Sequence, residues 1–159
     1  MTGISGMKVD SSAKDMADIV LNYKYRASWA TFRYHNDILI GDHFDGTCIC
    51  SSTESDMDRN ITKYRMFVDA IVMSDKDVRY AIVDFKYIDR SEGWCMTKSK
   101  RIFVLWAPDN ASPRKKMLAT IHLKDVQNQL TQQSCPIVIQ ANEKSDLIYE
   151  NVLKRIIFR

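Results

Sequence analysis

Five segments of the chain show the apolar patterns of β-strands. They lie at residues 28–34, 38–40, 78–88, 102–106 and 136–139. The segment 102–106 is wholly apolar, which is typical of a strand covered on both faces. The first two segments are separated only by residues 35–37, so they are expected to form a hairpin. The polar stretches 41–58 and 89–97 are predicted to be loops.

Four further segments repeat apolar residues at the spacing of one helix face. They cover residues 11–20, 61–72, 113–130 and 145–156. The first helix is expected to begin near Ser11 or Ser12, with Asp15 completing a capping box on Ser12. Ser145 is expected to cap the last helix. Residues 1–10 contain two glycines and no apolar periodicity, so they are predicted to form a flexible N-terminal arm.

The order of these elements, α β β α β β α β α, places hairpin-length links within the strand pairs and helices between them. This order predicts an α/β (α+β) fold in which helices pack against a central mixed sheet of five strands. A chain of 159 residues has the length of one domain. Residues 11–159 are therefore expected to fold as a single unit.

The helix predicted after residue 112 begins with an unusual distribution of charge. Ser112 is expected at the N-cap and Pro113 at the first helical position. Arg114, Lys115 and Lys116 then fill the first turn, where the helix dipole is positive and acidic residues are preferred. Each such cation forgoes or loses roughly 0.3–1 kcal/mol if exposed, which favours a surface shaped for an acidic partner. A solvated basic turn without a role is the alternative interpretation.

The positions of the charges are more informative than their total. Hydrophobic residues make up 45% of the chain and charged residues 27%, as in an ordinary globular protein, and a net charge of +3 is too small to indicate nucleic acid. The cations gather in three clusters, at residues 98–101, at residues 114–116, and at Lys154, Arg155 and Arg159. Because apolar residues such as Met117 lie beside them, the clusters fit a protein interface better than a contact with phosphate alone.

The sequence contains no catalytic or metal-binding motif. His35, His43 and His122 are scattered, and Cys48 and Cys50 lack the second pair or histidine cluster of a zinc site. We therefore expect no metal, no cofactor and no enzyme activity; a small α/β enzyme acting through His122 is the remote alternative. Without a signal peptide or an apolar run near 18 residues, the chain is expected to be cytoplasmic, with no membrane span.

Six segments of the chain carry a resemblance to one protein family. They are residues 5–10, 64–71, 79–87, 98–117, 123–130 and 137–146, which together extend over nearly the whole chain. The segment WAPD at 106–109, followed by KM at 116–117, is specific. Together these segments resemble the ADF/cofilin proteins, which are small actin-binding domains. The resemblance implies a mixed sheet sandwiched between helices, and a protein of the actin cytoskeleton that binds actin monomers and filaments and severs or depolymerises the filaments.

The resemblance also implies roles for residues that match the family's actin contacts. Contacts with both monomers and filaments are implied for Ser5, Gly6, Met7, Arg114, Lys116 and Met117. Contacts with filaments are implied for Lys98, Lys100, Lys154 and Arg155. Ser5 is the phosphorylation candidate, since about −1.5 to −2 added charges would oppose docking on an acidic partner. We also expect a monomer that binds no nucleic acid, and competition between actin and phosphatidylinositol bisphosphate for the basic clusters.

Four features depart from the family pattern. One additional residue between Met117 and Lys124 predicts a bulge in the long helix. Lys154 stands where an acidic residue is often found, Arg159 is shifted by one position, and the loop 41–58 is longer than typical. These departures keep an alternative function open, that of a relative without disassembly activity. Such a relative would bind filaments without severing, as coactosin does, or act on branch junctions, as glia maturation factor does.

Overall fold

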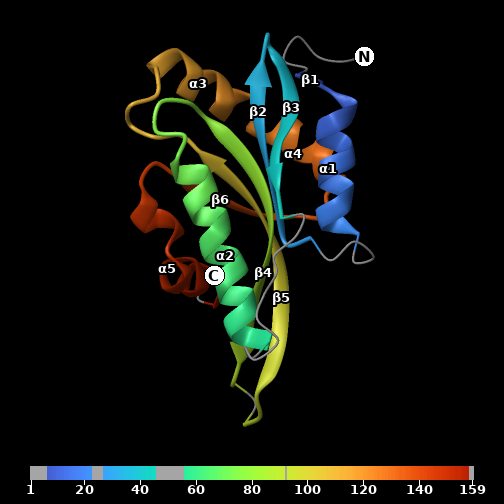
Figure 1. Cartoon of the computed structure of the whole chain (residues 1–159), viewed down its shortest axis with the longest axis vertical. Helices are drawn as coiled ribbons and strands as arrows, with labels where there is room; N and C mark the ends of the chain where they lie inside the picture. The colour runs from blue at the N-terminus through green and yellow to red at the C-terminus, as the bar shows by residue number, and fades with distance from the viewer. Residues whose placement is uncertain (1–6, 23–26, 46–55, 92, 158–159) are drawn as a thin grey trace.

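The computed structural model describes residues 7–22, 27–45, 56–91 and 93–157, and Figure 1 shows how their helices and strands are arranged. The strands are β1 (Lys8–Val9), β2 (Trp29–His35), β3 (Ile38–Phe44), β4 (Arg79–Asp89), β5 (Met96–Trp106) and β6 (Ile137–Ala141). The helices are α1 (Ser11–Leu21), α2 (Asp56–Val72), α3 (Pro113–Ile121), α4 (Leu123–Thr131), the short 3-10 helix η2 (Lys144–Leu147) and α5 (Tyr149–Ile157).

The predicted mixed sheet is confirmed, with one strand more than the five expected. Its order is β1-β3-β2-β4-β5-β6. The four inner strands pair antiparallel, whereas β1 and β6 join the two edges in parallel. The predicted hairpin at residues 35–37 is confirmed, with Asn36 and Asp37 at positive φ in the turn.

The additional strand lies in the segment that was expected to be a flexible arm. Residues 8–9 pair with residues 38–39 of β3, and the Asp10 amide donates to the Leu39 carbonyl at 2.8 Å. The prediction of an arm is therefore wrong for residues 7–10. Two paired residues are too few to produce a periodicity, so the sequence pattern could not reveal this strand. Residues 1–6 lie outside the described residues.

Helices cover both faces of the sheet, as expected (Figure 1). On one face, α1 and α4 pack over a core that includes Phe32, Tyr80 and Phe103. On the other, α2 and α5 pack over a core that includes Phe67 and Phe85. Side chains of β4 and β5 alternate between the two cores, which explains why residues 102–106 are wholly apolar.

Several predicted boundaries need correction. β3 continues through Phe44, so the predicted loop at 41–58 begins too early; residues 46–55 lie outside the described residues. α1 begins at Ser11 as predicted, but its cap is Asp10, whose carboxylate accepts from the Ser12 amide at 3.1 Å. Hydrogen bonds from the Ser12 hydroxyl and the Ser12 amide hold the pKa of Asp10 below its usual value.

The last helix also begins later than predicted. Ser145 lies inside η2, whose N-cap is Glu143, and α5 begins only at Tyr149. The side chain of Asp146 accepts from the amides of Asn142 and Glu143, which closes a separate turn before the helix. Local hydrogen bonding by acidic side chains thus replaced the serine cap that the sequence suggested.

The long helix predicted at 113–130 is interrupted where the sequence has its additional residue. α3 ends at Ile121, α4 begins at Leu123, and His122 lies between them. At this point the hydroxyl of Tyr80 donates to the Ala119 carbonyl at 2.7 Å. A side chain of the sheet therefore binds the carbonyl beside the interruption, and the predicted irregularity is confirmed.

Candidate functional site

The first turn of α3 presents the basic cluster that the sequence predicted. The hydroxyl of Ser112 accepts from the Lys115 amide at 3.2 Å, with Pro113 at the start of the helix. Arg114 is exposed, whereas the Lys115 ammonium lies 3.5 Å from the Asp77 carboxylate. The turn contains no acidic residue. The predicted cap is confirmed, and Arg114 is the cation of this turn that extends most directly to solvent.

Apolar side chains surround this basic turn on the surface. Met117 is 57% exposed, Ile121 57% and Leu118 37%. Met117 and Ile121 are four residues apart and therefore share one face of α3. Exposed apolar residues beside cations are the composition of a protein interface. The sequence interpretation missed Leu118 and Ile121. The helix contains four apolar residues after its basic turn, and the structure buries only Ala119 among them.

The N-terminal segment enters the fold beside α4. The amide of Met7 donates to the Asp125 carboxylate at 2.8 Å, and its carbonyl accepts from the Gln129 side chain at 2.8 Å. Gln129 also donates to Asp125 at 2.9 Å, so the three residues form one network. Ser5 and Gly6 lie outside the described residues. Met7 itself lies on the side of the molecule that carries the long helix.

Lys98 and Lys100 lie on the half of the β4–β5 hairpin that extends beyond the sheet (Figure 1). β2 pairs with β4 only through residues 80–83, and β6 pairs with β5 only from residue 102 onward, so this half is a two-stranded ribbon. Lys98 and Lys100 are two residues apart in β5 and share one face of the ribbon.

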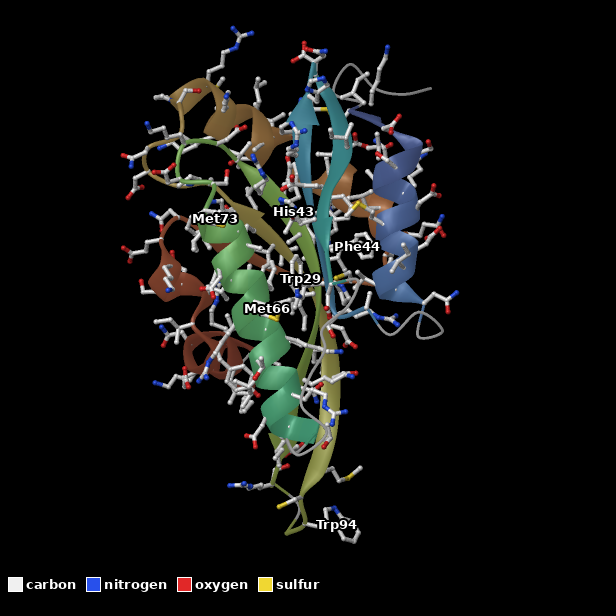
Figure 2. The ribbon with its side chains drawn as sticks, viewed as in Figure 1. Trp29, His43, Phe44, Met66, Met73 and Trp94 are labelled. Atoms are coloured by element: carbon white, nitrogen blue, oxygen red, sulfur yellow. The ribbon has the colours of Figure 1, made fainter. Side chains whose placement is uncertain are left out.

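The ribbon also carries a strong ion pair and an exposed tip. The Lys98 ammonium lies 2.6 Å from the Asp89 carboxylate. Lys98, together with hydrogen bonds from Ser91, holds the pKa of Asp89 well below its usual range. Trp94, at the tip of the hairpin, is 65% exposed (Figure 2). The ion pair orients Lys98 along the ribbon surface.

Lys154 and Arg155 are exposed in the last turn of α5. Cations in this position complement the negative end of the helix dipole. Val152 and Ile156 are buried and hold the opposite face of α5 against the sheet. Arg159 lies outside the described residues.

The predicted residues thus fall into separate regions instead of one cleft. Met7, Arg114, Lys116 and Met117 belong to the end of the molecule where α3 and β1 lie, and the ribbon projects from the opposite end (Figure 1). β5 connects the two ends, and its 11 residues span roughly 36 Å at about 3.3 Å each. A partner that contacts both regions must be large.

The described part of the chain offers no arrangement for metal chemistry. None of its His, Cys, Asp and Glu side chains form a group of three or more that could hold a metal ion. Among the described helices, none combines the length and apolarity required to cross a bilayer. His122 lies at the helix interruption, and the Nε2 atom of His43 lies 3.7 Å from the Asp42 carboxylate.

Comparison with known proteins assigns the family. The model of the cofilin/tropomyosin-type actin-binding proteins matches residues 6–157. The chain belongs to the ADF/cofilin family. A 154-residue match to a cofilin of Eremothecium gossypii is 30% identical and covers 96% of this chain and 93% of that protein. A shorter match of 85 residues to a cofilin of Yarrowia lipolytica is 36% identical and covers 53% of this chain and 52% of that protein.

Solved structures show the same fold. The ADF-like UNC-60A protein of Caenorhabditis elegans aligns with a TM-score of 0.75 at 21% identity, over 96% of this chain and 94% of that one. Human coactosin-like protein aligns with a TM-score of 0.73 at 14% identity, over 97% of this chain and all of that one. Family membership supports actin binding, whereas the fold is shared by ADF-like and coactosin-like proteins.

Proposed function

We propose that this protein binds actin monomers through the α3 end and actin filaments through both the α3 end and the ribbon, and that it promotes filament severing and depolymerisation. The monomer and filament contacts are assigned to Ser5, Gly6, Met7, Arg114, Lys116 and Met117. The filament contacts are assigned to Lys98, Lys100, Lys154 and Arg155. No covalent chemistry is required of any of these residues.

The observation that carries this proposal is the surface at the start of α3. Cations replace the acidic residues that a helix N-terminus prefers, and Met117 is exposed beside them instead of buried. A protein that gives up helix stability and exposes a methionine gains from a partner that is acidic and partly apolar. Within an actin-binding family, that partner is actin.

Disassembly would follow from differential affinity. A protein that binds one twist of the filament better than another shifts subunits toward the preferred state. The boundary between decorated and bare filament is then strained. A separate filament surface on the ribbon supports this mechanism, because one molecule could then contact neighbouring subunits.

The test is high-speed co-sedimentation with preformed actin filaments, together with a monomer-binding assay. Replacing Lys98 and Lys100 by alanine should weaken filament binding about tenfold, equivalent to about 1.4 kcal/mol, and leave monomer binding unchanged. The matched control replaces Lys14 and Lys76, which are exposed elsewhere and carry the same charge. Equal loss of both activities would contradict the two-surface assignment.

The same assay separates the proposed function from its alternative. Transfer of actin into the supernatant supports disassembly, whereas pelleting with intact filaments supports a coactosin-like filament binder. A soluble protein that leaves actin undisturbed would instead indicate a role at monomers or branch junctions. Regulation is tested there too, because a Ser5→Glu variant and vesicles with phosphatidylinositol bisphosphate should each lower actin binding at low salt.

A further inference from the structure

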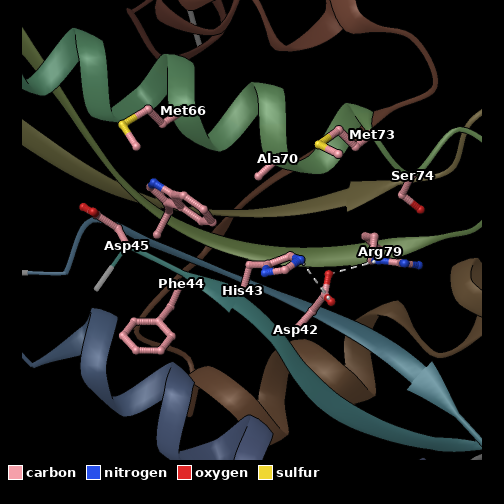
Figure 3. A pocket seen from close by; sticks show the side chains of 10 residues that line it. Asp42, His43, Phe44, Asp45, Met66, Ala70, Met73, Ser74 and Arg79 are labelled. Carbon is pink, nitrogen blue, oxygen red and sulfur yellow. Dashed lines mark hydrogen bonds and ion pairs between the residues drawn. The ribbon is translucent and has the colours of Figure 1, made fainter. Parts of the chain in front are cut away.

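A cleft of about 510 Å³ lies between α2 and the end of β3 (Figure 3). Met66 and Ala70 of α2 line one side together with Met73, which follows the helix, and His43 and Phe44 of β3 line the other. Its volume is that of an ordinary ligand site. None of the residues assigned above to actin line it, so it is unexplained by the proposed function.

The charged groups of the cleft are already paired within the chain. The Asp42 carboxylate lies 3.2 Å from the Arg79 guanidinium and 3.5 Å from that of Arg33. Asp45 accepts from the Ser28 amide at 3.3 Å and lies 3.9 Å from the Lys63 ammonium. A charged ligand would have to compete with these pairs. The cleft therefore favours a neutral ligand.

One polar group that lines the cleft has no hydrogen-bond partner among the described residues. Trp29 also lines the cleft; its side chain packs on Phe67 with ring centroids 5.9 Å apart, and the residue is 6% exposed. Its indole N–H finds no hydrogen-bond acceptor within the described part of the chain. The contrast with Trp106 is direct, since that indole donates to the Ser74 carbonyl at 2.7 Å. A buried donor without an acceptor is destabilising, so a ligand carbonyl at Trp29 would relieve this cost.

Three apolar residues that line the cleft are also exposed to solvent. Phe44 is 45% exposed, Met66 43% and Met73 83% (Figure 2). Methionine side chains are flexible and adapt to varied apolar partners. Exposed apolar side chains gathered around a cleft are characteristic of a protein interaction site.

We propose that this cleft binds an uncharged apolar segment of a partner polypeptide. A backbone carbonyl of the segment accepts from the Trp29 indole, and the adjacent bulky side chain packs among Phe44, Met66 and Met73. The pairing of Asp42 and Asp45 stays intact. This inference is independent of actin binding.

The three tryptophans allow a direct test by nuclear magnetic resonance of the ¹⁵N-labelled protein. The probe is N-acetyl-phenylalanine methylamide, which models one apolar residue of a peptide. Its titration should move the indole N–H signal of Trp29 saturably and leave those of Trp94 and Trp106 unchanged. Trp29→Phe assigns the signal. N-acetyl-alanine methylamide, with the same carbonyls, and the charged aspartate analogue should each bind at least tenfold more weakly.

Variants locate the probe within the cleft. Met73→Glu should weaken the phenylalanine probe at least fivefold, and the 83% exposure of Met73 makes a folding defect unexpected. Met96→Glu, on the ribbon and 48% exposed, is the matched control and should bind as the wild type does.

Four results would overturn the proposal. The first is an unmoved Trp29 signal, and the second is equal binding of the alanine probe. The third is a scalar coupling across a hydrogen bond from the Trp29 indole nitrogen to a carbonyl carbon in the free protein, which would mean that the chain satisfies the donor itself. The fourth is a dimer in sedimentation equilibrium that Met73→Glu dissociates, since a second copy would then be the occupant. Co-sedimentation of Met73→Glu with filaments should match the wild type; reduced binding would make the cleft part of the actin surface.

Discussion

The hydroxyl of Tyr80 joins two strands to the long helix. Tyr80 is fully buried in β4 and donates to the Ala119 carbonyl of α3 at 2.7 Å. The hydroxyl of Tyr34 in β2 lies 2.7 Å away, and since the Tyr80 proton is used, Tyr34 is the donor of that second bond. The carbonyl beside the interruption at His122 is thus satisfied by a side chain, as buried polar groups require.

Tyr80→Phe should therefore lower the free energy of unfolding by about 1–3 kcal/mol, because it leaves the Ala119 carbonyl without this donor. Tyr34→Phe should cost less, since the bond from Tyr80 to Ala119 remains. Guanidinium denaturation of both variants measures the difference. Equal losses would show that the bond to the helix carries no special weight.

Alkaline pH should destabilise the protein through the same pair. Burial raises the pKa of Tyr34 to about 12, despite the opposing effect of its hydrogen bond with Tyr80. In the unfolded chain the pKa is about 10. The stabilising contribution is therefore complete below pH 10 and is lost as the pH rises from 10 toward 12. Denaturation midpoints across this window should fall less steeply for Tyr34→Phe; identical slopes would contradict the assignment.

At the scale of elements, α1 lies close against β3 at Gly41. A Cβ atom at this position would lie 3.3 Å from the Ser12 carbonyl oxygen and would overlap the Met16 sulfur. The Gly41 amide also donates to the Ser12 hydroxyl oxygen at 3.3 Å. The lack of a side chain at Gly41 therefore leaves room for the Met16 side chain between the helix and the strand.

Gly41→Ala should reduce the free energy of unfolding by roughly 1–3 kcal/mol through overpacking. Met16→Ala in the same background should recover part of the loss, because it removes the atom that the new methyl group meets. A double-mutant cycle by chemical denaturation measures the coupling, which should be about 0.5 kcal/mol or more. Strict additivity would indicate that α1 moves freely away from β3.

At the scale of the whole molecule, the N-terminal segment is anchored to the second half of the long helix. The contact of Met7 with Asp125 joins positions 118 residues apart in sequence. It fixes the position of Met7, one of the proposed actin contacts.

Asp125→Ala should loosen this anchor. We expect faster hydrogen exchange at the Met7 amide. We also expect an actin affinity that is several-fold lower, because Met7 must then be ordered on binding. Asp15→Ala removes the same charge from an exposed site on α1 and serves as the control. Unchanged actin affinity together with faster exchange would separate the anchor from function.

The elements that the sequence predicted well are those whose pattern follows from their own burial. The segment 102–106 is apolar because both of its faces are covered, and Ser112 with Pro113 marks a helix start through its own hydrogen bond. The family segments and the cations at residues 98–100 and 114–116 are likewise visible in the sequence. Local chemistry of this kind determines strand, helix and surface charge without knowledge of the neighbours.

Only the tertiary structure decided the features that depend on distant partners. β1 exists because β3 offers an edge, and Met7 is held by Asp125 across the fold. The exposure of Leu118 and Ile121 follows from how α3 rests on the sheet. Likewise, the packing of α2 and β3 leaves the Trp29 indole without an acceptor in the part of the chain that the structure describes. Side-chain type and spacing describe a residue's preferences, whereas which atoms meet depends on packing between segments far apart in the chain.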